Sequence, residues 1–295
     1  MLASAFASWF GKSHPAPPMV APPTPDPVAP VAAPVPRTPW PPERLALADR
    51  LWGEGFGLPG GELETLRLTR SLGPSAAHSL LLVGGGHGGA ACAITREFGA
   101  WVAAMETEPE LVAAAQRLIA RAQLGRKASI ALWAPDKPVF DAHKYHHCVA
   151  LEPLIGPVEP ILEGLARALK PAGQLVMTDL VADAPPDPAT PGLARWAALE
   201  RRDPALLAAP AAITRLLGRV GMDVRIAEDV SERHLEHVVH AWRDLVRDLR
   251  GKRPDRGRAV QLVAEAERWL LRWRLIKDGR LRLMRWQAIS RGGAA

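Results

Sequence analysis

The sequence predicts an α/β fold: a doubly wound, seven-stranded, mostly parallel sheet with helices on both faces. The first observation behind this prediction is an apolar run at 79–83 that leads directly into five glycines at positions 84–89. The second is that short apolar runs alternate with amphipathic segments of helical length, which is the pattern of βαβ units. The third is an acidic residue, Glu106, at the end of the next apolar run. Doubly wound sheets bind ligands at this end of their strands.

Each predicted strand is a short apolar run bounded by turn residues, and each predicted helix carries apolar residues at helical spacing. Two helices precede the first strand, at 42–52 and 62–71, and the stretch between them, 53–61, contains five glycines. The remaining elements follow in the order strand 79–83, helix 90–98, strand 101–105, helix 109–124, strand 129–132, strand 147–151, helix 160–169, strand 174–180, helix 211–220, strand 222–226, helix 231–250, helix 258–278 and strand 281–289.

The N-terminal segment differs in composition from the rest of the chain. Residues 14–42 are dominated by Pro, Ala and Val, which form neither a helix nor a ladder, so an extended, disordered tether is predicted. Ahead of it, Leu2, Phe6, Trp9 and Phe10 recur at helical spacing. Residues 1–12 therefore form either a short helix that contacts a protein or a membrane surface, or a frayed end. We predict a disordered tail over 1–40 and one folded domain over 41–295.

Composition narrows the class of protein. The chain has 295 residues, of which 48% are hydrophobic and 23% charged, as in soluble globular proteins. No apolar stretch has the length of a membrane span. Cys92 and Cys148 lie in apolar runs without metal-ligand spacing, which favours a reducing compartment, and we expect a cytoplasmic protein.

Two groups of residues suggest partners that we do not expect. Arginines gather at 243–258, but acidic residues are interspersed among them. We therefore predict that these arginines lie on solvated helix faces, and we expect no binding of nucleic acid. His143, His146 and His147 are the densest histidine group. Alternation along a strand would send His146 and His147 to opposite faces, so no metal site is predicted.

The glycine loop and Glu106 form the predicted cofactor site. Gly84, Gly86 and Gly88 can adopt backbone angles that other residues avoid, which lets the chain approach a ligand closely. Glu106 can then accept hydrogen bonds from both hydroxyls of a ribose. The spacing Gly84-x-Gly86-x-x-Gly89 also satisfies the dinucleotide-binding pattern. These residues alone are therefore equally compatible with a nicotinamide cofactor.

A second motif narrows the choice of cofactor. Over 165–179 a predicted helix ends in Leu-Lys-Pro-Ala-Gly and turns into an apolar strand. This run resembles the Leu-x-Pro-Gly-Gly element of class I S-adenosylmethionine-dependent methyltransferases. In that family the first strand ends in a Gly-x-Gly-x-Gly loop, matched by Gly84, Gly86 and Gly88, and the second in an acid, matched by Glu106. The resemblance spans 40–290 and implies a Rossmann-like methyltransferase fold with S-adenosylmethionine as cofactor.

Within that family, the stretch 52–61 is similar to a Gly-x-Gly-Phe-x-x-Pro-Gly-Gly segment of phosphoethanolamine and related small-molecule N-methyltransferases. The resemblance implies that this loop closes over the methionine end of the cofactor; an ordinary glycine-rich connection is the alternative. Trp133 lies where the family's adenine-contacting loop is expected and would stack on the base, and Asp136 supplies the acid after the third strand. Leu82 stands where the family commonly has an Asp.

We expect the methyl acceptor to bind at the end of the fourth predicted strand, 147–151. Glu152 directly follows the fourth strand, where it would orient an amine or hydroxyl acceptor, accept its proton, or cap the turn. We expect methyl transfer to a small molecule, an amine or lipid precursor. The alternatives are a degenerate, non-catalytic member of the fold that acts as a binding or scaffolding module, and a nicotinamide-dependent oxidoreductase.

Overall fold

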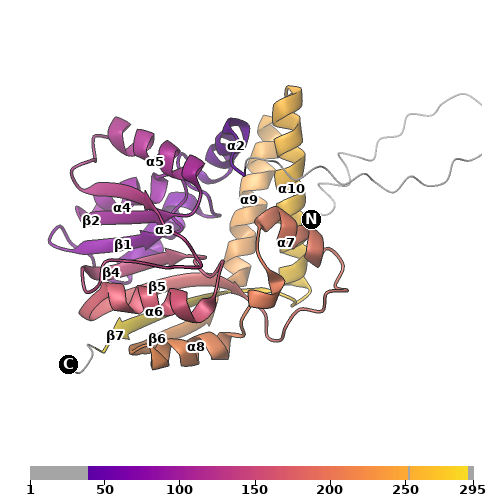
Figure 1. The fold of residues 1–295 in the computed structure, drawn as a ribbon. Coiled ribbons are helices and arrows are strands. Elements are labelled where there is room, and N and C mark those ends of the chain that lie inside the picture. Colours follow the sequence, from indigo (N-terminus) through magenta and orange to yellow (C-terminus); the bar gives the residue numbers. More distant parts are fainter. Residues whose placement is uncertain (1–38, 252, 292–295) are drawn as a thin grey trace, which may run out of the picture. The chain divides into compact units, whose positions relative to one another are not determined.

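The computed structural model describes residues 39–251 and 253–291, so residues 1–38 of the predicted tail, with its short helix, lie outside the described residues. The described chain forms a sheet of seven strands in the order β3-β2-β1-β4-β5-β7-β6. All neighbouring strands are parallel except β7, which runs antiparallel to both β5 and β6. The strands are β1 (Ser79–Val83), β2 (Trp101–Glu106), β3 (Ala128–Leu132), β4 (Tyr145–Leu151), β5 (Leu169–Val181), β6 (Met222–Asp229) and β7 (Arg282–Ser290). The predicted doubly wound sheet is confirmed (Figure 1).

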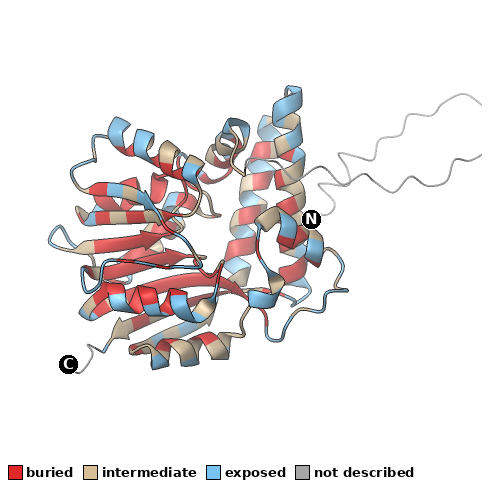
Figure 2. Ribbon diagram, in the orientation of Figure 1, coloured by how far each residue is buried: buried red, intermediate tan, exposed pale blue. Residues whose placement is uncertain are grey.

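Helices cover both faces of this sheet. Leu81 of β1 packs in one core with Ile161 and Leu165 of α6, whereas Leu82 faces Ala90 of α4 on the opposite side. Buried residues accordingly make up most of the central strands, whereas the helices alternate between buried and exposed residues (Figure 2). The helices are α2 (Pro42–Trp52), α3 (Gly61–Arg70), α4 (Gly89–Phe98), α5 (Pro109–Arg121), α6 (Val158–Ala168), α7 (Leu193–Glu200), α8 (Pro210–Arg219), α9 (Ser231–Asp248) and α10 (Arg256–Lys277).

The two long helices α9 and α10 stand side by side at one end of the sheet, and α2 contacts both (Figure 1). They form a second core with α7 and the end of β5, in which Leu180, Trp196 and Leu275 are buried. Helix α7 was not predicted, because its three buried side chains, Leu193, Trp196 and Ala197, have helical spacing but extend over little more than one turn. None of the helices in the described part of the chain combines the length and the hydrophobicity that crossing a bilayer requires.

Strand β5 begins earlier than predicted. The predicted strand started at Gln174, but Leu169 already pairs with Tyr145 of β4. A register shift separates this pair from the regular ladder, which begins where His147 pairs with Gln174. Ala172 adopts a φ of 60° in the irregular stretch between these two pairs. The predicted strand 174–180 therefore corresponds to the regularly paired part of β5.

Candidate active site

The glycine loop leaves no room for side chains. Gly84 and Gly86 have φ angles of 76° and 74°, in the left-handed region that favours glycine. A Cβ on Gly84 would lie 2.2 Å from the carbonyl oxygen of Leu151, and a Cβ on Gly86 would lie 2.7 Å from the nitrogen of Gly57. Both glycines therefore let the backbone of neighbouring segments approach the end of β1.

Glu106 lies beside this loop at the end of β2. Its side chain is buried, and its Oε2 accepts a hydrogen bond from the Gly86 N–H at 3.2 Å. Its Oε1 accepts a second one from the Thr107 N–H at 2.9 Å. Burial raises the pKa of Glu106 to about 7, against these two backbone hydrogen bonds. The structure thus holds a carboxyl that is about half ionised near neutral pH, next to closely packed backbone.

The other residues predicted for the cofactor flank this pair. Gly88 precedes α4, where a Cβ would lie 2.9 Å from Cα of Ala115, so it permits the contact between α4 and α5. The Trp133 N–H donates to the Glu106 carbonyl oxygen at 3.1 Å, but its ring is buried against Phe140, with ring centroids 5.5 Å apart. Asp136 is exposed in the following turn.

The glycine-rich stretch 53–61 lies directly on the glycine loop. The Gly89 N–H donates to the carbonyl oxygen of Gly55 at 2.9 Å. Asp49 on α2 accepts from the Gly55 N–H at 2.7 Å, and the same Oδ1 lies 2.7 Å from Nε2 of His87. Burial opposes ionisation of Asp49, but its bonds to His87 and Gly55 prevail and lower its pKa. Sequence reasoning missed Asp49, because nothing local distinguishes it from a solvated helix residue.

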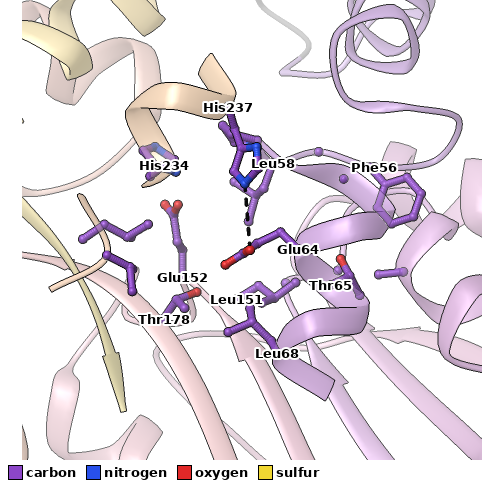
Figure 3. Close-up of a pocket in the computed structure, with 18 residues that line it drawn as sticks. Phe56, Leu58, Glu64, Thr65, Leu68, Leu151, Glu152, Thr178, His234 and His237 are labelled. Carbon is purple, nitrogen blue, oxygen red and sulfur yellow. Dashed lines mark ion pairs between the residues drawn. The ribbon is translucent and has the colours of Figure 1, made fainter. Parts of the chain in front are cut away.

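A cavity opens where the glycine loop, the stretch 53–61, α3 and α9 meet (Figure 3). It reaches Gly84 and Gly85 but not Glu106, Trp133 or Asp136. Its apolar wall includes Phe56, Leu58, Leu68, Leu151 and Val230, and its polar wall Glu64, Thr65, Glu152, Thr178, His234 and His237. Sequence reasoning identified only Glu152 among these polar residues.

Glu152 is held in a buried network of charges. It adopts a φ of 54° just after β4, and its carboxylate forms ion pairs with Arg272 and, at 3.0 Å, with Arg202. Arg202 also binds Asp179 at the end of β5 at 2.9 Å, and Arg272 lies 3.3 Å from Glu200 of α7. Burial favours the neutral form of Glu152, but Arg272 and Arg202 outweigh it and lower its pKa. Glu152 is therefore a fixed anion.

The two arginines of this network were not predicted. Arg202 follows α7, which was itself not predicted, and Arg272 lies on α10, where arginines were interpreted as solvated. Arg272 is only 1% exposed. A signal was present in the sequence, since Arg268 and Arg272 recur at the spacing of the apolar residues of α10 around Trp269 and Ile276.

The predicted histidine group lies at the opposite, amino-terminal end of β1 and β4. Nε2 of His147 is 3.0 Å from Nδ1 of His78, and His146 binds Ser79 and Lys170. Within 39–251 and 253–291, no cluster of three His, Cys, Asp or Glu residues is arranged to hold a metal ion.

Comparison of the sequence with protein-family models and with curated proteins found no match. Solved structures do resemble it. Phosphoethanolamine N-methyltransferase 2 of Haemonchus contortus, in complex with phosphomonomethylethanolamine and S-adenosylhomocysteine, has a TM-score of 0.72 at 17% identity. The alignment covers 83% of this chain but only 56% of that one.

For two further solved structures, the alignment covers a larger share of the solved chain. Geranyl diphosphate C-methyltransferase of Streptomyces coelicolor, in complex with Mg²⁺, geranyl diphosphate and S-adenosylhomocysteine, has a TM-score of 0.59 at 14% identity over 77% of this chain and 76% of that one. The cyclase SpnF has a TM-score of 0.63 at 14% identity over 85% and 94%. At such identities the likeness concerns the fold alone. The chain therefore has the fold of the class I S-adenosylmethionine-dependent methyltransferases, as its motifs predicted.

Proposed function

We propose that this protein binds S-adenosylmethionine and transfers its methyl group to a small-molecule acceptor. The observation that carries the proposal is the buried Glu106 carboxyl, hydrogen-bonded to Gly86 at the carboxyl ends of β1 and β2. When bound, the cofactor supplies a methyl group already activated by a sulfonium, so the protein has only to bind, align and exclude water.

The residues present suit an adenosyl group. Gly84 and Gly86 keep the end of β1 free of side chains, as close approach of a ligand requires. Glu106 in its ionised form accepts hydrogen bonds from the two ribose hydroxyls. Gly88, Trp133 and Asp136 border the same strand ends, and we assign the adenine to the side of Trp133 and Asp136. The stretch 53–61, tied to the loop through Asp49, covers the methionine end and excludes water.

At the acceptor end we assign Glu152 an orienting role. It lines the cavity next to Gly84 and Gly85, and two arginines fix its position. Because its pKa is lowered, Glu152 accepts a proton poorly near neutral pH. Its fixed negative charge instead attracts a positively polarised group of the acceptor. We assign the acceptor to the amines or lipid precursors. We place this reaction in the cytoplasm, because both cysteines are free and buried.

Thermal-shift titration of the full chain tests the proposal. S-adenosylhomocysteine should raise the melting temperature, whereas NAD and NADP should not. Glu106→Gln should reduce the shift, and Glu110→Gln on the next helix should retain it in full. A shift with NAD alone would support the oxidoreductase, and no shift with any of them would support the scaffold. Because the similar fold of SpnF belongs to a cyclase, transfer of labelled methyl to a panel of small acceptors has to follow.

A further inference from the structure

Two carboxylates line the cavity beside the glycine loop, and the arginines paired with them lie outside its described lining. Glu64 reaches it from α3 and Glu152 from the end of β4 (Figure 3). Burial favours the neutral form of Glu64, yet its bonds to Arg67 and His237 lower its pKa to about 2. Both carboxyls are therefore ionised near neutral pH.

No lysine or arginine is among the described residues that line this cavity. The nearest guanidinium groups already bind carboxylates. Arg67 donates two hydrogen bonds to Glu64, at 2.8 and 2.7 Å, while Arg202 and Arg272 are committed to the network around Glu152. Arg and Lys are the donors that bind a phosphate group best, and the described lining of this cavity holds neither.

His234 supplies a second, independent observation. It lines the same cavity from α9, is only 6% exposed, and its buried Nε2 has no hydrogen-bond partner among the described residues. Figure 3 shows the carboxylate of Glu152 directed towards the His234 ring. Burial and the nearby Arg272 hold the pKa of His234 well below its usual range, so the imidazole is neutral and has a nitrogen that accepts a hydrogen bond. A buried polar atom without a partner is costly, and a donor from a ligand would satisfy Nε2 in the tautomer that carries the proton on Nδ1.

We propose that this cavity selects acceptors with a basic nitrogen attached to a small apolar body, and rejects phosphorylated ones. Glu64 and Glu152 attract the cationic nitrogen, His234 accepts a hydrogen bond from it, and Leu68 and Val230 enclose the apolar part. This inference rests on the proposed function, whose acceptor site it specifies. It separates the chain from the structural relatives described as acting on phosphoethanolamine and geranyl diphosphate.

The test compares benzylamine, benzyl alcohol and benzyl phosphate, which share one apolar group and differ in charge. Each is titrated calorimetrically into protein saturated with S-adenosylhomocysteine. Benzylamine should bind about tenfold or more tightly than the alcohol, because charge-assisted hydrogen bonds distinguish the two. Benzyl phosphate should show no binding. Glu64→Gln should remove about tenfold of the benzylamine affinity, whereas Glu62→Gln, an exposed residue on the same helix, should not.

The outcomes separate this inference from the proposed function. Benzyl phosphate that binds as tightly as benzylamine, or more tightly, overturns the inference. Equal binding of all three compounds, or no binding of any, overturns it too. The affinity for S-adenosylhomocysteine is a separate readout. If S-adenosylhomocysteine itself does not bind, the proposed function fails. The three compounds titrated alone then still decide what the cavity selects. His234→Asn should weaken benzylamine and leave S-adenosylhomocysteine unchanged; unaltered benzylamine affinity contradicts the role given to His234.

Discussion

Replacing Glu106 by Gln should separate what this carboxyl does for the ligand from what it does for the fold. Burial raises its pKa from 4.5 to about 7, so in the free protein it is about half protonated at neutral pH. A carboxylate accepts hydrogen bonds from both ribose hydroxyls, whereas a protonated carboxyl must itself donate one. Binding of an adenosyl ligand should therefore favour the ionised form and release a proton.

The magnitude follows from the ionised fraction. With a pKa of about 7, that fraction is about 9% at pH 6 and about 91% at pH 8. S-adenosylhomocysteine should accordingly bind wild-type protein about tenfold more tightly at pH 8, with about half a proton released at pH 7. Glu106→Gln should remove this pH dependence and weaken binding at pH 8 by at least about tenfold, since each charge-assisted hydrogen bond contributes about 1.5 to 3 kcal/mol.

The same pKa predicts the opposite effect on stability. A carboxyl whose pKa is higher in the folded state stabilises the fold at low pH, and this contribution is lost as the pH rises through about 7. Between pH 5 and pH 8 the loss is about 2.5 kcal/mol. The free energy of unfolding of wild-type protein should fall by that amount relative to Glu106→Gln, although Gln leaves one of the Gly86 and Thr107 N–H donors without an acceptor at every pH.

Two measurements check these values. Titration calorimetry in buffers of different ionisation enthalpy counts the protons released, and urea unfolding at pH 5 and pH 8 gives the stability difference. Glu110→Gln serves as the control and should behave as wild type in both. Wild-type binding that is equally tight at pH 6 and pH 8, without proton release, would refute the assignment of Glu106 to the ribose.

Four other perturbations have clear expected outcomes. Gly86→Val should abolish binding of S-adenosylhomocysteine in calorimetry and strain the backbone by about 1 to 3 kcal/mol, because φ is positive and the overlying loop is in contact. Asp49→Ala should lower the free energy of unfolding by about 1 to 3 kcal/mol and weaken the same ligand, because two hydrogen bonds to the loop are lost. Arg202→Met should cost about 3 to 5 kcal/mol in urea unfolding, since the buried Asp179 loses its ion-pair partner and the buried Glu152 keeps only Arg272. The exposed neighbour Arg201→Met should cost at most about 1 kcal/mol. Deleting residues 1–38 should leave the melting temperature and ligand affinity unchanged, as the proline-rich composition predicts.

The fold was predictable because most elements carry their own local signal. Each strand of the sheet coincides with an apolar run, and α2 has the predicted bounds, with a proline at its first position. Helix α7 carries only a short local signal of this kind, and it is stabilised by contacts with α10 and β5, which are distant in sequence. Tertiary packing, and not propensity, determines helices of this kind.

The residues of the candidate site likewise fall into those that the sequence predicts and those that it does not. Gly84, Gly86 and Glu106 were predictable because a strand end and its loop bring them together within one βαβ unit. Arg202, Glu64 and His234 were not, because each lies on a different element and acquires its role only when the elements pack. A buried arginine or histidine has no local pattern that separates it from a solvated one, and its partners identify it only in three dimensions.

A crystal structure of the protein with S-adenosylhomocysteine tests the central claim most directly. We expect the ribose hydroxyls within hydrogen-bond distance of the Glu106 carboxylate, the methionine end against Gly84 and Gly86 under the stretch 53–61, and the sulfur facing the cavity lined by Glu64 and Glu152. Density for the ligand at any other place, or a Glu106 still bound only to Gly86 and Thr107 in crystals grown at saturating ligand, would contradict the account.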